Sequence, residues 1–212
     1  MPPTPVKITE LRVAHLPDHP PCDDDHVVTR SGPPGLRLVL MRATKSGRDG
    51  VELRSTVSPA EAASLGLPSD RLFREAIDQS LGASDMAVEP MWEDQVKGLW
   101  VVAGDSTVTA LFYRLKRFPR LLGEHGSFVA LADKHTMVFF RIDAAESLDS
   151  GPVVAACSAL AESEELSTDF PIWWTDGSVY EAIEFIADPD GDGSFMSPGP
   201  LFSKVADRLQ TR

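Results

Sequence analysis

The segment Ser127–Asp143, with the sequence SFVALADKHTMVFFRID, constrains the fold of this chain more than any other stretch. It contains two apolar runs rich in Val and Phe, and the polar residues Asp133, Lys134 and His135 separate them. Val and Phe favour strands, and a short polar break between two such runs is typical of a β-hairpin. A second hairpin is predicted where LRLVLMRAT and VELRSTV flank the sequence KSGRDG, because its two glycines reach positive φ at low cost.

The rest of the chain alternates between strand-like and helix-like spacing. Shorter apolar segments predict strands at residues 6–14, 98–104 and 170–174. In residues 58–82, Ser58 and Ser69 are expected to cap helices. The apolar stripe of this segment is Leu72, Phe73, Ala76, Ile77 and Leu81. Further helices are predicted at residues 105–118, 149–166, 178–186 and 201–210; the first of these should turn Val108, Leu111, Phe112 and Leu115 inward.

Hairpins interspersed with single helices predict an α+β fold, in which a mainly antiparallel sheet built from hairpins carries helices on one face. A chain of 212 residues is long enough to bury one substantial core, so residues 1–212 are expected to form a single α+β domain. A flexible loop is expected near residues 15–35, where the sequence HLPDHPPCDDDH is rich in Pro and Asp.

Composition argues against some classes of partner and indicates the cellular compartment. The formal net charge of −12 argues against nucleic acid, because neutralising phosphates needs clustered Lys and Arg. No apolar run approaches the roughly 20 residues of a membrane helix, and the N-terminus lacks the pattern of a signal peptide. Cys22 and Cys157 are the only cysteines, which fits a reducing compartment. We therefore expect a cytoplasmic protein with no membrane partner.

The acidic excess is concentrated in the C-terminal third. Residues 144–212 carry 13 acidic and three basic side chains. Such a segment is either an ordinary solvated surface or a face that attracts a basic partner.

One acidic loop matches the first half of a calcium site. In DPDGDGSF, Asp188, Asp190 and Asp192 occupy the first, third and fifth positions of an EF-hand loop, and Gly193 occupies its glycine position. The twelfth position requires a bidentate Glu but is Gly199, so calcium would keep about half of its usual ligands and bind at millimolar concentration at best. The alternative is an Asp/Gly turn whose side chains cap its own backbone.

The N-terminal loop offers a second set of possible metal ligands. Its spacing matches no common zinc pattern, and its three prolines restrict how the chain can fold round an ion, so a solvated loop is the better interpretation. The possible ligands are His15, His19, Cys22, Asp23, Asp24, Asp25 and His26. No cofactor is expected, with calcium at Asp188–Asp192 as the alternative.

A third candidate is Ser106. The sequence LWVVAGDSTVTALF resembles the first block of the GDSL-type esterases, in which the serine between strand and helix is the nucleophile. The resemblance implies Ser106 as nucleophile, with His125 or His135 as base. The chain contains no Asn for an oxyanion hole, and the loss of one oxyanion donor alone can cost about 10²–10³ in rate. The alternative is that Asp105 and Ser106 cap a helix.

A basic segment interrupts this acidic chain. YRLKRFPR contains Arg114, Lys116, Arg117 and Arg120 beside aromatic residues. It is either an ordinary exposed face or a contact with a partner or with the acidic C-terminal third.

The central third of the chain resembles the bacterial YtpQ-like domain family, through RLFREAIDQSL, GLWVVAGDSTVTALFYRL and GSFVALADKHTMVFFRID. That family has a similar helix, a Gly-Asp turn between strand and helix, and a hairpin in which VA(V/I)P-x-R-D leads into an apolar strand. In this chain LADKH, residues 131–135, replaces the Pro and the Arg-Asp pair. The resemblance implies an α+β fold and a structural role for Gly104-Asp105-Ser106, and it carries no established activity.

These observations predict a non-enzymatic binding or adaptor protein. Such a protein, for example an immunity-type protein, would mask a basic protein partner with its acidic C-terminal third. No catalytic residue is expected on this interpretation, and the sequence does not single out partner-binding residues. The alternatives are a GDSL-like serine hydrolase that uses Ser106 and a weak calcium-binding module at the Asp188–Asp192 loop.

Overall fold

The computed structural model describes residues 6–17, 26–46, 51–92, 94, 96–105, 107–133, 135–148, 172–187 and 194–211. The chain divides into two compact units. Unit 1 comprises Met1–Asp85 and Asp105–Ala110, and unit 2 comprises Met86–Gly104 and Leu111–Arg212. The expectation of one domain over residues 1–212 stays a prediction, because compactness does not decide whether the two units fold together.

Unit 1 contains a four-stranded antiparallel sheet built around one long strand. Its strands are β1 (Leu11–Pro17), β2 (Thr29–Ser31), β3 (Leu36–Ser46) and β4 (Val51–Thr56). Arg42 of β3 pairs with Leu11 of β1 and also with Ser55 of β4. β2 and β4 therefore follow one another along the edge of β3 opposite β1. The hairpin predicted around KSGRDG is confirmed as β3 and β4.

Two helices follow this sheet in the chain, α1 (Pro59–Ser64) and α2 (Ser69–Ala83), and a short 3-10 helix, η1 (Ile8–Glu10), precedes it. Ser58 caps α1 as expected, and the Glu61 carboxylate accepts a bond from the Ser58 amide at 2.9 Å. Ser69 does not cap α2, because it is the first residue of that helix and Pro68 stands at the cap position. The predicted stripe of α2 is buried, except that Ser80 takes the place expected for Leu81. The Ser80 hydroxyl accepts a bond from the Val13 amide of β1 at 2.9 Å, which explains why a polar residue lies inside.

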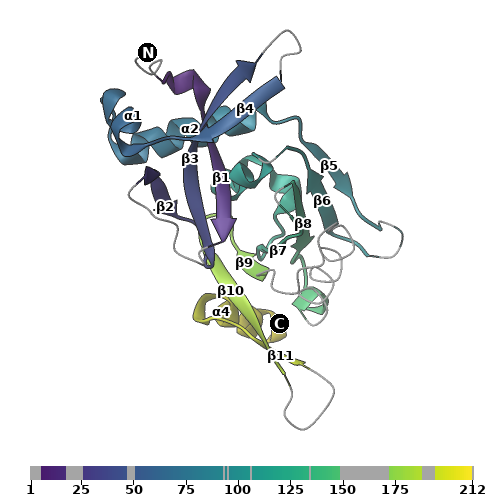
Figure 1. Ribbon diagram of the computed structural model, residues 1–212. Coiled ribbons are helices and arrows are strands. Elements are labelled where there is room, and N and C mark those ends of the chain that lie inside the picture. Colours follow the sequence, from purple (N-terminus) through teal and green to yellow (C-terminus); the bar gives the residue numbers. More distant parts are fainter. Residues whose placement is uncertain are drawn as a thin grey trace. The chain divides into compact units, whose positions relative to one another are not determined.

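Unit 2 contains a seven-stranded antiparallel sheet in the order β11-β10-β9-β7-β8-β6-β5 (Figure 1). The hairpin predicted at Ser127–Asp143 is confirmed as β7 and β8, with Ser127 opposite Arg141. The strands predicted at residues 98–104 and 170–174 are confirmed as β6 and β9. The strands of unit 2 are β5 (Ala87–Pro90), β6 (Leu99–Ala103), β7 (Ser127–Leu131), β8 (Thr136–Arg141), β9 (Ile172–Thr175), β10 (Tyr180–Ala187) and β11 (Ser194–Ser197).

Aromatic residues on both faces of β9 fill the core of unit 2. Adjacent residues of a strand point to opposite faces, so Trp173 and Trp174 do not share neighbours. The Trp173 ring packs edge to face with Phe112, with centroids 5.3 Å apart. On the other face, Phe202 lies 5.9 Å from Trp174 and 5.1 Å from Phe128. Phe202 comes from α4 (Pro200–Gln210), the terminal helix that the sequence predicts.

The helix predicted at residues 178–186 is wrong, because this segment is strand β10. Its nine residues fit either period, and an isolated helix of that length is marginal in water. Pairing with both β9 and β11 gives the segment two ladders of backbone hydrogen bonds, which a helix here would forgo.

The α-helix predicted at residues 105–118 is also wrong. The chain forms three short 3-10 helices, η3 (Val108–Tyr113), η4 (Leu115–Arg117) and η5 (Pro119–Leu121). The β-branched run at residues 107–109 lowers helix propensity, and Pro119 stops any continuation. The residues expected to face inward are nevertheless buried: Val108, Leu111, Phe112 and Leu115 are at most 1% exposed.

The predictions for the fold class and for the N-terminal segments are confirmed in part. The α+β fold with mainly antiparallel sheets is confirmed. Part of the loop expected near residues 15–35 is strand, since β1 continues to Pro17 and β2 begins at Thr29. The strand expected at residues 6–14 begins only at Leu11, after η1. The helix expected at residues 149–166 lies outside the described residues. Among the helices of the described segments, none is long and apolar enough to cross a membrane.

Candidate functional site

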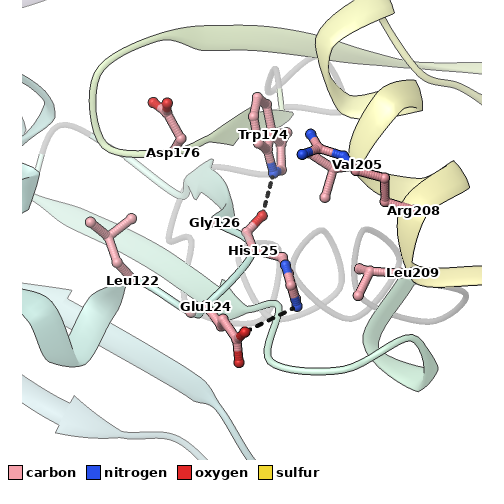
Figure 2. Close-up of a pocket in the computed structure, with 10 residues that line it drawn as sticks. Leu122, Glu124, His125, Gly126, Trp174, Asp176, Val205, Arg208 and Leu209 are labelled. Carbon is pink, nitrogen blue, oxygen red and sulfur yellow. Dashed lines mark hydrogen bonds and ion pairs between the residues drawn. The ribbon is translucent and has the colours of Figure 1, made fainter. Parts of the chain in front are cut away.

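Unit 2 contains a pocket of about 340 Å³ at one end of its sheet (Figure 2). Three segments form it: the loop between η5 and β7, the end of β9 with the turn after it, and the last turns of α4. Its lining residues are Leu122, Gly123, Glu124, His125, Gly126, Trp174, Asp176, Val205, Arg208 and Leu209.

The loop at residues 122–126 has every backbone amide paired. Most partners are backbone carbonyls, and the Glu124 amide instead donates to Asp143 Oδ1. The donor to acceptor distances are 3.2 Å for Leu122 to Pro119, 3.1 Å for Gly123 to Gly126, 3.0 Å for Glu124 to Asp143, 2.9 Å for His125 to Ile142 and 3.2 Å for Gly126 to Gly123. The loop therefore presents no spare N–H group that could bind an anion or serve as an oxyanion hole.

Two glycines let this loop lie against its neighbours. A Cβ on Gly123 would come within 2.5 Å of the Ile142 backbone. Gly126 has φ +93°, and a Cβ there would overlap the carbonyl oxygen of Thr175 and lie 2.7 Å from Trp174 Nε1. Only glycine satisfies both the conformation and the close approach at position 126. The pocket wall is thus held by backbone contacts.

Trp174 joins the loop to the sheet. Its indole Nε1 donates to the His125 carbonyl at 3.1 Å, and the residue is only 4% exposed. Val205 and Leu209 of α4, on the right in Figure 2, add apolar surface to the lining. Trp174 and these two side chains make the pocket partly apolar, while its charges lie at the rim.

The charged residues of the rim differ in exposure. The side chain of Glu124 is 72% exposed, whereas that of His125 is 24% exposed, with Nε2 3.9 Å from Glu124 Oε1. Asp176 Oδ1 accepts bonds from the amides of Ser178 at 2.7 Å and Val179 at 3.0 Å, which fixes this carboxylate in its turn. The sum of formal charges on the lining is −1 with His125 neutral, because Arg208 offsets one of the two carboxylates.

Unit 1 contains a separate network of ion pairs that has a structural role. The Arg54 guanidinium bonds Glu52 at 2.8 Å and Asp105 at 2.7 Å, and Asp105 also accepts from the Thr107 amide at 2.8 Å. Burial alone would raise the pKa of Asp105, but the hydrogen bonds from Thr107 and Arg54 outweigh burial and hold the pKa below its usual value. The Asp105 carboxylate thus ties the segment Asp105–Ala110 to β4.

Most of the residues singled out from the sequence do not lie together. Asp188, Asp190, Asp192 and Ser106 fall outside the described residues, so the calcium and hydrolase hypotheses stay predictions. In the described parts of the chain, no three His, Cys, Asp or Glu side chains are placed to hold a metal ion.

Of the five histidines proposed as ligands or bases, His19 lies outside the described residues, and the other four occupy different places. His15 is on β1, where burial lowers its pKa to about 3. His26 is exposed near β2, and His135 is exposed in the turn between β7 and β8. His125 lines the pocket.

Sequence reasoning missed the pocket itself. Glu124, the segment 174–176 and Arg208 are far apart in the chain and belong to no motif. The one local signal is GEHG, residues 123–126, in which two glycines bracket a carboxylate and an imidazole.

Comparison with known proteins gives no relative: no family model, no curated protein and no solved structure matches this chain.

Proposed function

We propose that this protein binds a basic protein partner without catalysing a reaction, and that the pocket of unit 2 is the centre of the contact surface. One observation carries the proposal: a pocket with a partly apolar wall has two carboxylates at its rim, and its loop amides are all engaged.

The chemistry of the lining supports binding over catalysis. None of the lining residues carries a hydroxyl, thiol or amine nucleophile, and acyl transfer needs such a group together with an oxyanion hole. Among the lining side chains, the ion-pair contact of His125 is with Glu124 (Figure 2). Without a group to activate, this pair positions charge at the rim.

The charge of the surface supports a basic partner. Glu146, Asp176, Glu184 and Asp207 are exposed carboxylates of unit 2, and the whole chain carries a net charge of −12. A field of this sign accelerates encounter with a basic protein and disfavours acidic ones. Masking a basic toxin, as an immunity-type protein does, is one role that such a surface suits.

The proposal is tested with a flexible octapeptide that contains four lysines, titrated into the labelled protein and followed by NMR. We expect chemical-shift changes at residues 122–126, 174–176 and 205–209, and weaker binding at 500 mM salt than at 50 mM salt. A matched peptide with four glutamates is the control and is expected to leave these signals unchanged. Binding that is indifferent to salt, or equal binding of both peptides, would refute the proposal.

A further inference from the structure

We infer that the pocket of unit 2 takes one ammonium or guanidinium group on an apolar stem, which is the chemistry of a single Lys or Arg side chain of the partner. This inference rests on the proposed function, and it assigns the pocket a chemical class of ligand.

The first step is the exclusion of anions. Backbone N–H groups are the usual donors to phosphate, sulfate and carboxylate in loops. Each amide of residues 122–126 already has a protein acceptor, so this loop has none to offer. The turn after β9 is similar, because the amides of Gly177 and Ser178 donate to the side chains of Thr175 and Asp176. Among the lining side chains, Arg208 is the permanent cation that an anion would find.

The second step is the attraction of a cation. The carboxylates of Glu124 and Asp176 are both exposed at the rim. In the described segments, neither carboxylate forms an ion pair with Lys or Arg. Val205 and Leu209 lie in the last turns of α4, and the carboxyl end of a helix favours positive charge. Two of the carbonyls at this end, those of Asp207 and Arg208, already accept bonds from the Thr211 hydroxyl at 2.8 and 3.3 Å.

The third step is the apolar stem. Lys and Arg bury their methylene groups along apolar surface while the charged end stays among polar groups. Trp174, Val205 and Leu209 supply that surface, and the carboxylates lie at the rim (Figure 2). The volume of about 340 Å³ is at the lower end of the range of about 300–1,000 Å³ for ligand sites, which suits one long side chain.

The positive charge of Arg208 repels a cationic ligand, and this repulsion makes the inference testable. It is the one permanent positive charge on the lining, and its Nε donates to the Lys204 carbonyl at 2.9 Å. If the ligand is a cation, removing the charge of Arg208 should strengthen binding and removing that of Glu124 should weaken it. For an anionic ligand both signs reverse.

The experiment uses propylguanidinium as the probe and follows the indole N–H signal of Trp174 by NMR. Butyrate, with a similar stem and the opposite charge, is the control ligand. We expect the signal to shift with propylguanidinium at a dissociation constant on the order of millimolar, and to be unaffected by butyrate. Glu124→Gln should weaken binding about two- to fivefold and Arg208→Gln should strengthen it by a similar factor.

Matched variants separate local from general charge effects. Glu89→Gln removes an exposed carboxylate of β5, and Arg74→Gln removes an exposed guanidinium of unit 1; both should leave the affinity unchanged. An unshifted Trp174 signal, or tighter binding of butyrate, overturns the inference. If the lysine peptide still shifts the signals of residues 122–126, 174–176 and 205–209 in a salt-dependent way, the proposed contact surface stands and only the assignment of one cationic group to the pocket fails.

Discussion

Gly126 is the residue whose replacement tests the construction of the pocket most directly. In Gly126→Ala, the alanine would have to adopt φ +93°. Its methyl group would overlap the Thr175 carbonyl oxygen and lie 2.7 Å from Trp174 Nε1. Positive φ costs a side chain about 1–2 kcal/mol. Overpacking of a close-packed site adds about 1–3 kcal/mol, and displacing the loop also weakens the bond from Trp174 to His125, worth about 1 kcal/mol. We therefore expect the free energy of unfolding of unit 2 to fall by about 3–6 kcal/mol.

Gly98→Ala is the matched control in the same unit. Gly98 also has positive φ, +85°, but its Cβ would meet nothing closer than the Cβ of Arg141 at 3.4 Å, an ordinary contact. Its expected loss is only the conformational cost of about 1–2 kcal/mol. The difference between the two variants isolates the close approach at position 126.

Urea denaturation followed by tryptophan fluorescence measures both variants. All four tryptophans of the chain lie in unit 2, so the signal reports on that unit. With a slope of about 1–3 kcal/mol per molar urea, the two midpoints should differ by roughly 1–2 M. Equal midpoints for Gly98→Ala and Gly126→Ala would show that the loop has room for a methyl group, and the account of a backbone-fixed pocket would then be wrong.

Three further predictions concern polar groups away from the pocket. Glu181 accepts bonds from the first amides of α4, Leu201 at 3.0 Å and Phe202 at 2.7 Å, so Glu181→Gln should destabilise unit 2 by about 1–2 kcal/mol in the same assay; no change would mean that the helix start needs no charge. Asp105→Asn should destabilise unit 1 by about 1 kcal/mol at pH 7, a figure reduced for partial exposure, as measured by hydrogen exchange of β3 amides. Because the folded pKa of Asp105 is lowered, its contribution is present above the ordinary carboxyl pKa of about 3.9 and disappears as the pH falls through the folded pKa, so the variant and the wild type should converge in acid. His15 has a folded pKa of about 3, so its contribution is present above the usual pKa of 6.5 and is lost as the pH falls from 6.5 toward 3. The free energy of unfolding of unit 1 should fall by about 2 kcal/mol between pH 6.5 and pH 5, and His15→Gln should remove this pH dependence. If the free energy of unfolding of the variant falls as much over this pH range, another group is responsible.

Errors at the level of secondary structure have a common physical origin. The segments at residues 105–118 and 178–186 are short, and their apolar residues fit more than one period. Pairing with β9 and β11 made the second segment a strand. In the first segment, the β-branched run at residues 107–109 and Pro119 disfavoured a continuous α-helix, and Arg54 of β4 holds its start at Asp105. Burial was easier to predict than conformation, because an apolar side chain leaves water whichever backbone carries it.

The candidate site was less accessible to prediction. His125 was noticed from the sequence as a possible base, yet the pocket gives it Glu124 as its neighbour and no nucleophile. Nothing local distinguishes Asp176 or Arg208 from other surface charges. Their role depends on a β9 turn and a terminal helix that lie beside the same loop.

The amino-acid sequence alone determined the α+β class, both hairpins, the buried stripe of α2 and the terminal helix, because alternation, helical spacing and turn residues act over a few neighbouring positions. Only the tertiary structure decided that β10 is a strand, that residues 108–121 form 3-10 turns, and that residues 122–126, 174–176 and 205–209 enclose a pocket. Strand β10 and the pocket depend on hydrogen bonds and close approaches between segments far apart in the chain, and no local pattern encodes where such segments meet.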